Sequence, residues 1–189
     1  MPLRRNNIDT DQIIPARFCS HVKRTGHGAS LFGDWRQDPD FVLNDPSYRQ
    51  ATILVAAREF ATGSSREYAV WAIKNYGFDV VIAQSFGDIF YKNAIINDLL
   101  PLKTTQEGIE WLWHCIENDP SVSIDIELET NTITVGKRCL AAIMEPHYKK
   151  KYILNLDDIA QTMQHIDQIQ RYEATRYARL TTTLPAGDR

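Results

Sequence analysis

The residue types best suited to chemistry are gathered in one short stretch, Gly63–Glu67, which reads Gly-Ser-Ser-Arg-Glu. The stretch follows the apolar run Thr52–Ala56 and precedes Tyr68–Ile73, so the sequence predicts a glycine-pivoted turn that leads into a helix. A helix N-terminus presents unpaired backbone N–H groups and a partial positive charge, and here two hydroxyls and a guanidinium are added. This combination is suited to holding an anion.

The same residues have a purely structural interpretation, because Ser64 and Glu67 have the spacing of a capping box. In that case each side chain satisfies the backbone amide of the other, and no ligand is involved. Three features favour a ligand site. Ser65 is not needed for the cap, Arg66 places a cation against the helix dipole, and Gly63 permits a close backbone approach. A bound carboxylate would explain the arginine.

The elements around this stretch predict an α/β fold. We expect a buried strand at 52–57, a helix at 64–75 and a second buried strand at 79–83. The right-handed crossover of such a βαβ unit makes the strands parallel and puts the Gly63 turn at the carboxyl end of the first strand, where open α/β sheets place ligands. Further expected elements are a helix at 86–97 ended by a short strand or turn at 99–102, a helix at 105–118, a hairpin of 122–128 with 133–135, and a helical segment at 156–177.

Two predicted loops could border the site. Asn7–Pro15 is a polar turn with a short apolar end, and we expect either a turn capped by Asp9 or Thr10 or a site rim. Residues 20–46 predict a long, mobile loop, which is typical of a lid, a binding loop or a solvated excursion. Its cations become relevant only if the site holds an anion. Four aromatic residues are expected to pin this loop to the core: Phe32, Trp35, Phe41 and Tyr48.

Length and composition limit the functional classes. A chain of 189 residues suits one domain, which we place at 1–179, followed by a loose tail at 180–189. The net charge of -3 argues against a general nucleic-acid binder or an anionic-membrane binder. Three scattered cysteines lack zinc or iron–sulfur spacing, so we expect reduced thiols and no metal site in this chain. With no signal-peptide pattern or membrane-spanning stretch, we expect a cytoplasmic protein.

Several ordered motifs together resemble the small subunits of 3-isopropylmalate dehydratase, which are similar to the swivel domain of aconitase. The matching segments are Asn7–Pro15, Arg24–Gly26, Leu31–Arg36, Asp40–Asn44, Gly63–Glu67, Ser85–Phe90, Leu99–Pro101 and Leu156–Ala160. The resemblance implies a swivelling β/β/α domain with a parallel βαβ core. The chain departs from the family pattern at Tyr68, where histidine is usual, and at Ala61, where glycine is frequent.

The resemblance also implies a function. Members of this family interconvert 2- and 3-isopropylmalate in leucine biosynthesis, by removing and re-adding water through isopropylmaleate. Their [4Fe-4S] cluster, which acts as a Lewis acid, is held by a separate large subunit, so this chain would bind no cofactor itself. By the same resemblance Ser64 would be the base that takes a proton from carbon. Ser65 and Arg66 would bind the substrate carboxylate, Asp11 would lie at the site edge, and Arg24 would lie in the loop that senses the variable group.

Two other functions stay open at this stage. The chain could be a non-catalytic swivel-type module that binds an anion or a partner chain. It could also serve a related hydratase that acts on citraconate or homoaconitate. A self-sufficient serine hydrolase is disfavoured, because no Gly-x-Ser-x-Gly motif surrounds the serines.

Overall fold

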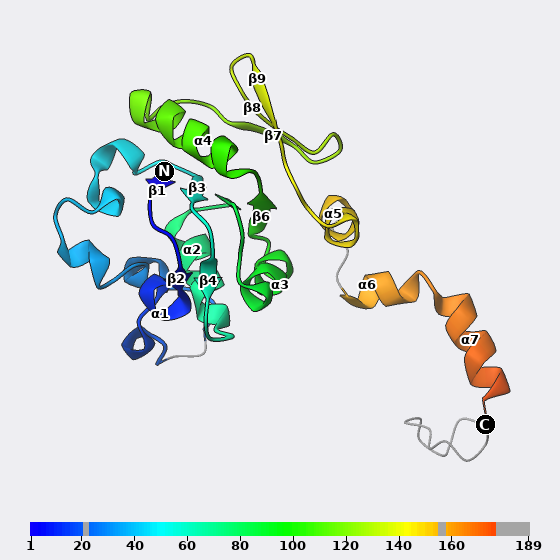
Figure 1. The fold of residues 1–189 in the computed structure, drawn as a ribbon. Coiled ribbons are helices and arrows are strands. Elements are labelled where there is room, and N and C mark those ends of the chain that lie inside the picture. Colours follow the sequence, from blue (N-terminus) through cyan, green and yellow to red (C-terminus); the bar gives the residue numbers. More distant parts are fainter. Residues whose placement is uncertain (21–22, 155–157, 177–189) are drawn as a thin grey trace.

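The computed structural model describes residues 1–20, 23–154 and 158–176, and its centre is a four-stranded parallel sheet (Figure 1). The order is β1-β3-β5-β6, with β1 at Pro2–Leu3, β3 at Ile53–Ala56, β5 at Val80–Ala83 and β6 at Leu100–Lys103. Strands β3 and β5 confirm the two predicted strands, and their parallel pairing confirms the predicted βαβ unit. The apolar stretch at 99–102 contributes a full sheet strand.

A second, shorter parallel ladder continues beyond the β1–β3 pair. Strand β2 (Ile8–Asp9) pairs with β4 (Phe60–Thr62), and the two chain segments are joined before this ladder by the bond from the Asn7 amide to the Arg58 carbonyl, at 3.0 Å. The predicted strand therefore ends before β4 begins. The Gly63 turn follows β4 and not β3, which corrects the expected position of the turn.

Helices join the parallel strands. Helix α2 (Glu67–Tyr76) connects β4 to β5, and α3 (Asp88–Ile96) connects β5 to β6, with α2 packed on α3. Helix α4 (Gln106–Asn118) lies against β1 and β3 and confirms the predicted helix at 105–118. Its amphipathic face buries Ile109, Leu112, Trp113 and Ile116. No described helix is both long enough and apolar enough to cross a membrane.

The carboxyl-terminal third contains more strands and helices than the sequence predicted. The predicted hairpin forms between β7 (Asp125–Glu127) and β8 (Thr132–Val135), and the unpredicted strand β9 (Arg138–Ala141) makes it a three-stranded antiparallel sheet. Three helices follow: α5 at Pro146–Ile153, α6 at Asp158–Met163 and α7 at Ile166–Thr175. The single predicted helical segment is thus split at 164–165, and α5 was not predicted. The predicted tail at 180–189 lies outside the described residues.

The long segment between α1 (Thr10–Ile13) and β3 carries regular structure instead of the expected mobile loop. Short 3₁₀ helices occupy 16–18, 28–30, 35–37, 42–44 and 46–48. The expected aromatic anchoring is confirmed, because Phe32 is fully buried and its ring stacks on Trp35 at 5.2 Å and meets Phe41 edge-on at 5.8 Å. Tyr48 packs against the same core.

Candidate active site

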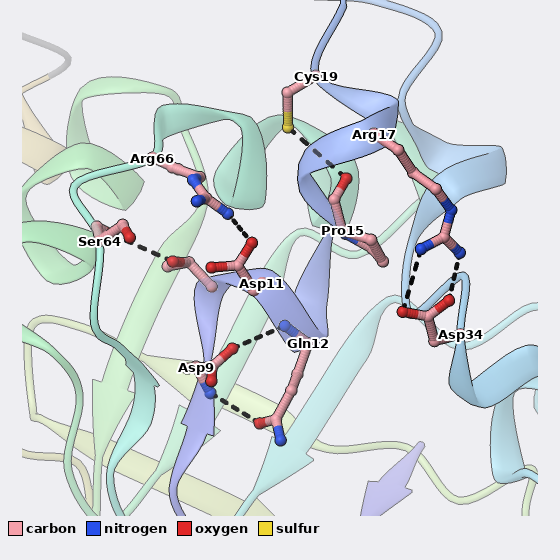
Figure 2. Close-up of polar contacts among 10 residues, drawn as sticks. Asp9, Asp11, Gln12, Pro15, Arg17, Cys19, Asp34, Ser64 and Arg66 are labelled. Carbon is pink, nitrogen blue, oxygen red and sulfur yellow. Dashed lines mark hydrogen bonds and ion pairs between the residues drawn. The ribbon is translucent and has the colours of Figure 1, made fainter.

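The topology brings together two segments that are far apart in the sequence. Strands β2 and β4 are parallel neighbours, so their carboxyl ends meet at one edge. Helix α1 follows β2 and carries Asp11, while the Ser-Ser-Arg turn follows β4. As Figure 2 shows, the Arg66 guanidinium donates from Nη1 to Asp11 Oδ1. The Thr10 hydroxyl also reaches across, donating to the Ser64 carbonyl at 3.3 Å.

A capping box fixes the orientation of the short helix α1. The Asp9 side chain accepts from the Gln12 amide at 2.7 Å, and the Gln12 side chain accepts from the Asp9 amide at 3.0 Å. This confirms the expectation of a turn capped by Asp9. The cap also serves the site, because it sets the direction in which Asp11, two residues on, points toward Arg66.

The alternative capping box between Ser64 and Glu67 does not form. Helix α2 begins at Glu67 with Arg66 as its N-cap, three residues later than predicted, and no side chain caps it. The Glu67 carboxylate instead accepts from Asn97 Nδ2 at 2.8 Å. The backbone of Ser64 turns back on itself, since its carbonyl accepts from the Arg66 amide at 2.8 Å. The serine hydroxyls are therefore not used to start the helix.

The turn presents a set of hydrogen-bond donors to solvent. Ser64 and Ser65 are exposed, and within the described part of the chain their hydroxyls make no hydrogen bond. The backbone amides of Glu67 and Tyr68, in the first turn of α2, likewise have no acceptor among the described residues. Together with the guanidinium of Arg66, these groups can bind a carboxylate.

Electrostatics keep the Arg66 guanidinium charged and favour the neutral form of a neighbouring thiol. The hydrogen bond to Asp11 raises the pKa of Arg66 above its already high ordinary value, so the guanidinium stays charged. Burial raises the pKa of the Cys19 thiol, an effect that the positive charge of Arg66 partly offsets. The raised pKa favours the protonated thiol of Cys19 over the thiolate.

The backbone before the turn is held in unusual conformations. Ala61 has a φ of 59° and is the extra residue of a β-bulge, because Ile8 pairs with Phe60 and Asp9 with Thr62. A left-handed conformation is one that glycine adopts more easily than alanine. Gly63 has a φ of 90°. Gly87 packs so closely on this segment that a Cβ there would lie 2.4 Å from the Ala61 carbonyl oxygen.

Arg24 is not joined to the other predicted site residues. It is exposed, and among the described residues it makes no contact with Asp11, Ser64 or Arg66. The segment that carries it is nevertheless anchored on helix α2. The buried ring of His27 meets Tyr68 edge-on at 5.2 Å and stacks on Trp71 at 5.8 Å, so the loop lies over the helix that follows the candidate site.

Possible metal ligands do not gather in the described part of the chain. Within residues 1–20, 23–154 and 158–176, no group of three or more histidine, cysteine, aspartate or glutamate side chains could hold a metal ion. The three cysteines are free and lie in separate parts of the fold. The donor set at the turn, made of hydroxyls, amides and a guanidinium, suits an anion and does not fit an iron–sulfur cluster.

Sequence reasoning did not identify two supporting residues, Thr10 and Asn97, as parts of the site. No local pattern shows either role, because each residue acts on a segment more than 25 positions away in the chain. Only the pairing of β2 with β4 and the packing of α3 on α2 reveal their roles. Asn97 also accepts from the Trp71 indole at 3.0 Å, so it joins two turns of α2 to the end of α3.

Known proteins are similar to this chain both in sequence and in fold. The profile of the aconitase C-terminal domain matches residues 1–107, and the profile of the C-terminal domain of 3-isopropylmalate dehydratase small subunits matches residues 158–179. A 3-isopropylmalate dehydratase small subunit of Bifidobacterium animalis is 47% identical over 98% of this chain and 84% of that protein. One of Mycobacterium marinum is 46% identical over 98% and 93%.

A solved structure extends the likeness to the fold. The chain matches a 3-isopropylmalate dehydratase structure from Methanocaldococcus jannaschii with a TM-score of 0.64 and 23% identity, covering 90% of this chain and 95% of that one. At this identity the match bears on the fold alone, and it agrees with the expected swivel-type α/β architecture. The relatives in sequence are 43% to 47% identical over nearly the whole chain. The chain therefore belongs to the family of 3-isopropylmalate dehydratase small subunits, and its first 107 residues form an aconitase C-terminal domain.

Proposed function

We propose that this chain is the small subunit of a 3-isopropylmalate dehydratase of leucine biosynthesis. With a large subunit it interconverts 2-isopropylmalate and 3-isopropylmalate, by removing water and adding it back at the neighbouring carbon. The names of its relatives support the reaction and the presence of a larger partner. The site geometry supports the part that this chain would take in the reaction.

One observation carries the proposal: Arg66, held by the Asp11 carboxylate of the same chain, lies beside two exposed serines at the N-terminus of α2. A guanidinium in this position can grip a substrate carboxylate with two parallel bonds, whereas a lysine offers a point charge. We assign Arg66 and Ser65 to this carboxylate. The unpaired amides of the first turn of α2 add donors on the same side.

Ser64 is assigned the proton transfer at carbon. A serine hydroxyl is a weak base, so its ionised form needs stabilisation by nearby positive charge. The helix N-terminus and Arg66 both supply that charge, and the absence of a capping hydrogen bond leaves the hydroxyl available. Ser64 would take the proton during dehydration and return it during hydration.

Asp11 is assigned a positioning role. Its carboxylate would repel a dicarboxylate substrate at close range, but it fixes the direction of the Arg66 guanidinium. Arg24, on the segment anchored by His27, is assigned to the border of the pocket that receives the variable group of the substrate. Closure of that pocket would need the partner subunit.

The metal cluster that assists loss of the hydroxyl group is assigned to the large subunit, because the described residues of this chain do not fit it. This division of the site agrees with the exposure of Ser64 and Ser65, which lie open on this chain. We place the complex in the cytoplasm, where the substrates of amino-acid biosynthesis are found.

Reconstitution tests the proposal. The chain is mixed with an anaerobically reconstituted large subunit, and the absorbance of the unsaturated intermediate is followed with isopropylmalate as substrate. We expect no turnover from either chain alone and turnover from the mixture. Citraconate and homoaconitate, assayed with the same complex, identify a related hydratase if they are turned over faster. Turnover by the isolated chain would contradict the proposal.

A further inference from the structure

We propose that helices α6 and α7, residues 158–175, form an arm that docks on the large subunit through an apolar face. The inference rests on the proposed function, both for the partner and for the exposed turn at Ser64 that would meet this partner. It concerns a part of the chain far from the candidate active site in sequence, and outside the range that matches the aconitase domain.

The arm exposes large apolar side chains. Ile159 is 73% exposed, Met163 53% and Tyr172 63%, and Ile166 is exposed as well. Isolated exposed apolar residues are ordinary, but four within 14 positions on two successive helices are not. In Figure 1 the two helices extend away from the sheet and its covering helices, which agrees with the exposure of these side chains.

The apolar residues share one side of each helix. In α7, Ile166, Ile169 and Tyr172 are spaced by three positions, which at 100° per residue places them within a stripe of about 120°. Asp167 and Arg171 occupy the opposite side of the same helix. In α6, Ile159 and Met163 are four positions apart and therefore neighbours on the helix surface. A helix with this pattern buries its apolar side against another surface.

The residue ranges that the two family profiles match indicate which surface covers the apolar side of the arm. The aconitase profile describes a C-terminal domain, which is part of a longer chain, and it ends at residue 107. The separate profile that begins at residue 158 belongs to small subunits of 3-isopropylmalate dehydratase and covers this arm. In aconitase the domain is covalently tethered to the rest of the chain, whereas in the dehydratase it is a separate subunit. The separate subunit needs additional non-covalent attachment to its partner. The arm supplies such an attachment.

The size of the arm favours the large subunit over a second copy of this chain. A stable interface uses roughly 20–30 residues on each side, which is more than the apolar side of two short helices provides. The arm is therefore suited to extend an interface that exists elsewhere. The exposed turn at Ser64, which must meet the partner for catalysis under the proposed function, provides such an interface. Binding at two places also raises the overall affinity.

The test compares two full-length variants. In the first, Ile159→Gln, Met163→Gln and Tyr172→Gln remove three apolar side chains from the arm. In the second, the control, Asp167→Asn and Arg171→Gln alter the polar side of α7 only. Affinity for the large subunit is measured anaerobically by titrating this chain into a fixed amount of large subunit and following turnover. Circular dichroism and sedimentation of each chain alone report fold and self-association.

We expect the first variant to need about tenfold or more higher concentration for half-maximal activity, with the rate at saturation unchanged and the control like the wild type. Equal affinity of both variants and the wild type would overturn the inference. Loss of self-association with unchanged affinity for the large subunit would also overturn it, in favour of a second copy. If the wild-type chains form no complex at all, the proposed function fails first, and the docking arm with it.

Discussion

The guanidinium of Arg66 is bound by the carboxylate of Asp11, 55 positions earlier in the chain, because the strands that precede the two residues are parallel neighbours. The pair is partly exposed, with 30% of the Arg66 side chain and 51% of the Asp11 side chain accessible. At this exposure an ion pair adds little to stability, typically about 0–1 kcal/mol. Its effect lies in orientation, which gives the arginine a fixed direction before substrate arrives.

Asp11→Ala should therefore impair catalysis more than folding. We expect the kcat/KM of the reconstituted complex to fall about tenfold or more, because the guanidinium loses its fixed direction, while the free energy of unfolding changes by less than about 1 kcal/mol. Asp34→Ala is a matched control, since Asp34 is also 51% exposed and pairs with Arg17. Steady-state kinetics of both variants check this. A lower KM in Asp11→Ala would show that Asp11 merely competes with substrate.

Asn97, at the end of α3, should hold the start of α2 in place and with it the Ser-Ser-Arg turn. Asn97→Ala removes the bond to Glu67 and leaves the nearly buried Trp71 indole without an acceptor, so we expect a stability loss of about 1–3 kcal/mol and a raised KM. Asp79→Asn, which weakens the Lys74–Asp79 pair at the other end of α2, serves as the control. Denaturation and kinetics are measured together. If Asn97→Ala and Asp79→Asn show the same KM after correction for the fraction of folded protein, the positioning role of Asn97 is wrong.

Gly87→Ala should disturb the strand that leads to the turn. The added Cβ would meet the Ala61 carbonyl oxygen at 2.4 Å, a backbone atom that cannot move without shifting β4. We expect a loss of about 1–3 kcal/mol together with reduced turnover per folded molecule. Gly136→Ala lies in the β8–β9 turn, where its φ of 58° makes alanine unfavourable but no neighbour is close. Gly136→Ala should therefore lose stability but keep normal turnover per folded molecule. Equal turnover per folded molecule in Gly87→Ala and Gly136→Ala would show that the shift of β4 does not reach the site.

Tyr91 should make the fold sensitive to alkali. Burial raises its pKa to about 12, against 10 in the unfolded chain, although the nearby Glu145 backbone acts in the opposite direction. Because the folded state holds this proton more tightly, the associated stability is complete below pH 10 and is lost as the pH rises through about 12. The loss amounts to roughly 2–3 kcal/mol.

Tyr91→Phe should remove this alkaline loss. Its effect near pH 7 should be small, because the buried hydroxyl forms no well-aligned hydrogen bond among the described residues and has only the Glu145 backbone nearby. Urea denaturation of the wild type and the variant at pH 7, 9 and 11 checks both statements. Parallel stability curves across this range would contradict the assignment of the alkaline loss to Tyr91.

Local patterns in the sequence predicted much of the fold. The apolar runs of β3 and β5 and the periodicity of α4 are strong local signals, and they were confirmed. The Gly63–Glu67 stretch was also chosen as the place of chemistry from its residue types, and that choice stays a prediction. The strand and helix predictions succeeded because each depends on neighbours within one element.

The remaining features depend on contacts between distant segments. The capping box at Ser64 and Glu67 was a sound local prediction, but Asn97 binds the Glu67 carboxylate from α3 and the helix begins later. Strand β4 was missed because its three residues are defined by pairing with β2 and by the bulge at Ala61. The Asp11–Arg66 pair likewise follows from strand pairing, which no local pattern contains. The roles of Ser64, Ser65, Arg66, Asp11 and Arg24 remain predictions.

The most direct measurement is the turnover of isopropylmalate by a complex that contains Ser64→Ala. We expect a loss of roughly 10²–10⁴-fold in turnover, the usual contribution of a general base, with complex formation intact and stability within about 0.5 kcal/mol of the wild type. Ser65→Ala, one position on, should mainly raise KM. A Ser64→Ala complex that turns over isopropylmalate at the wild-type rate would contradict the assignment of the base.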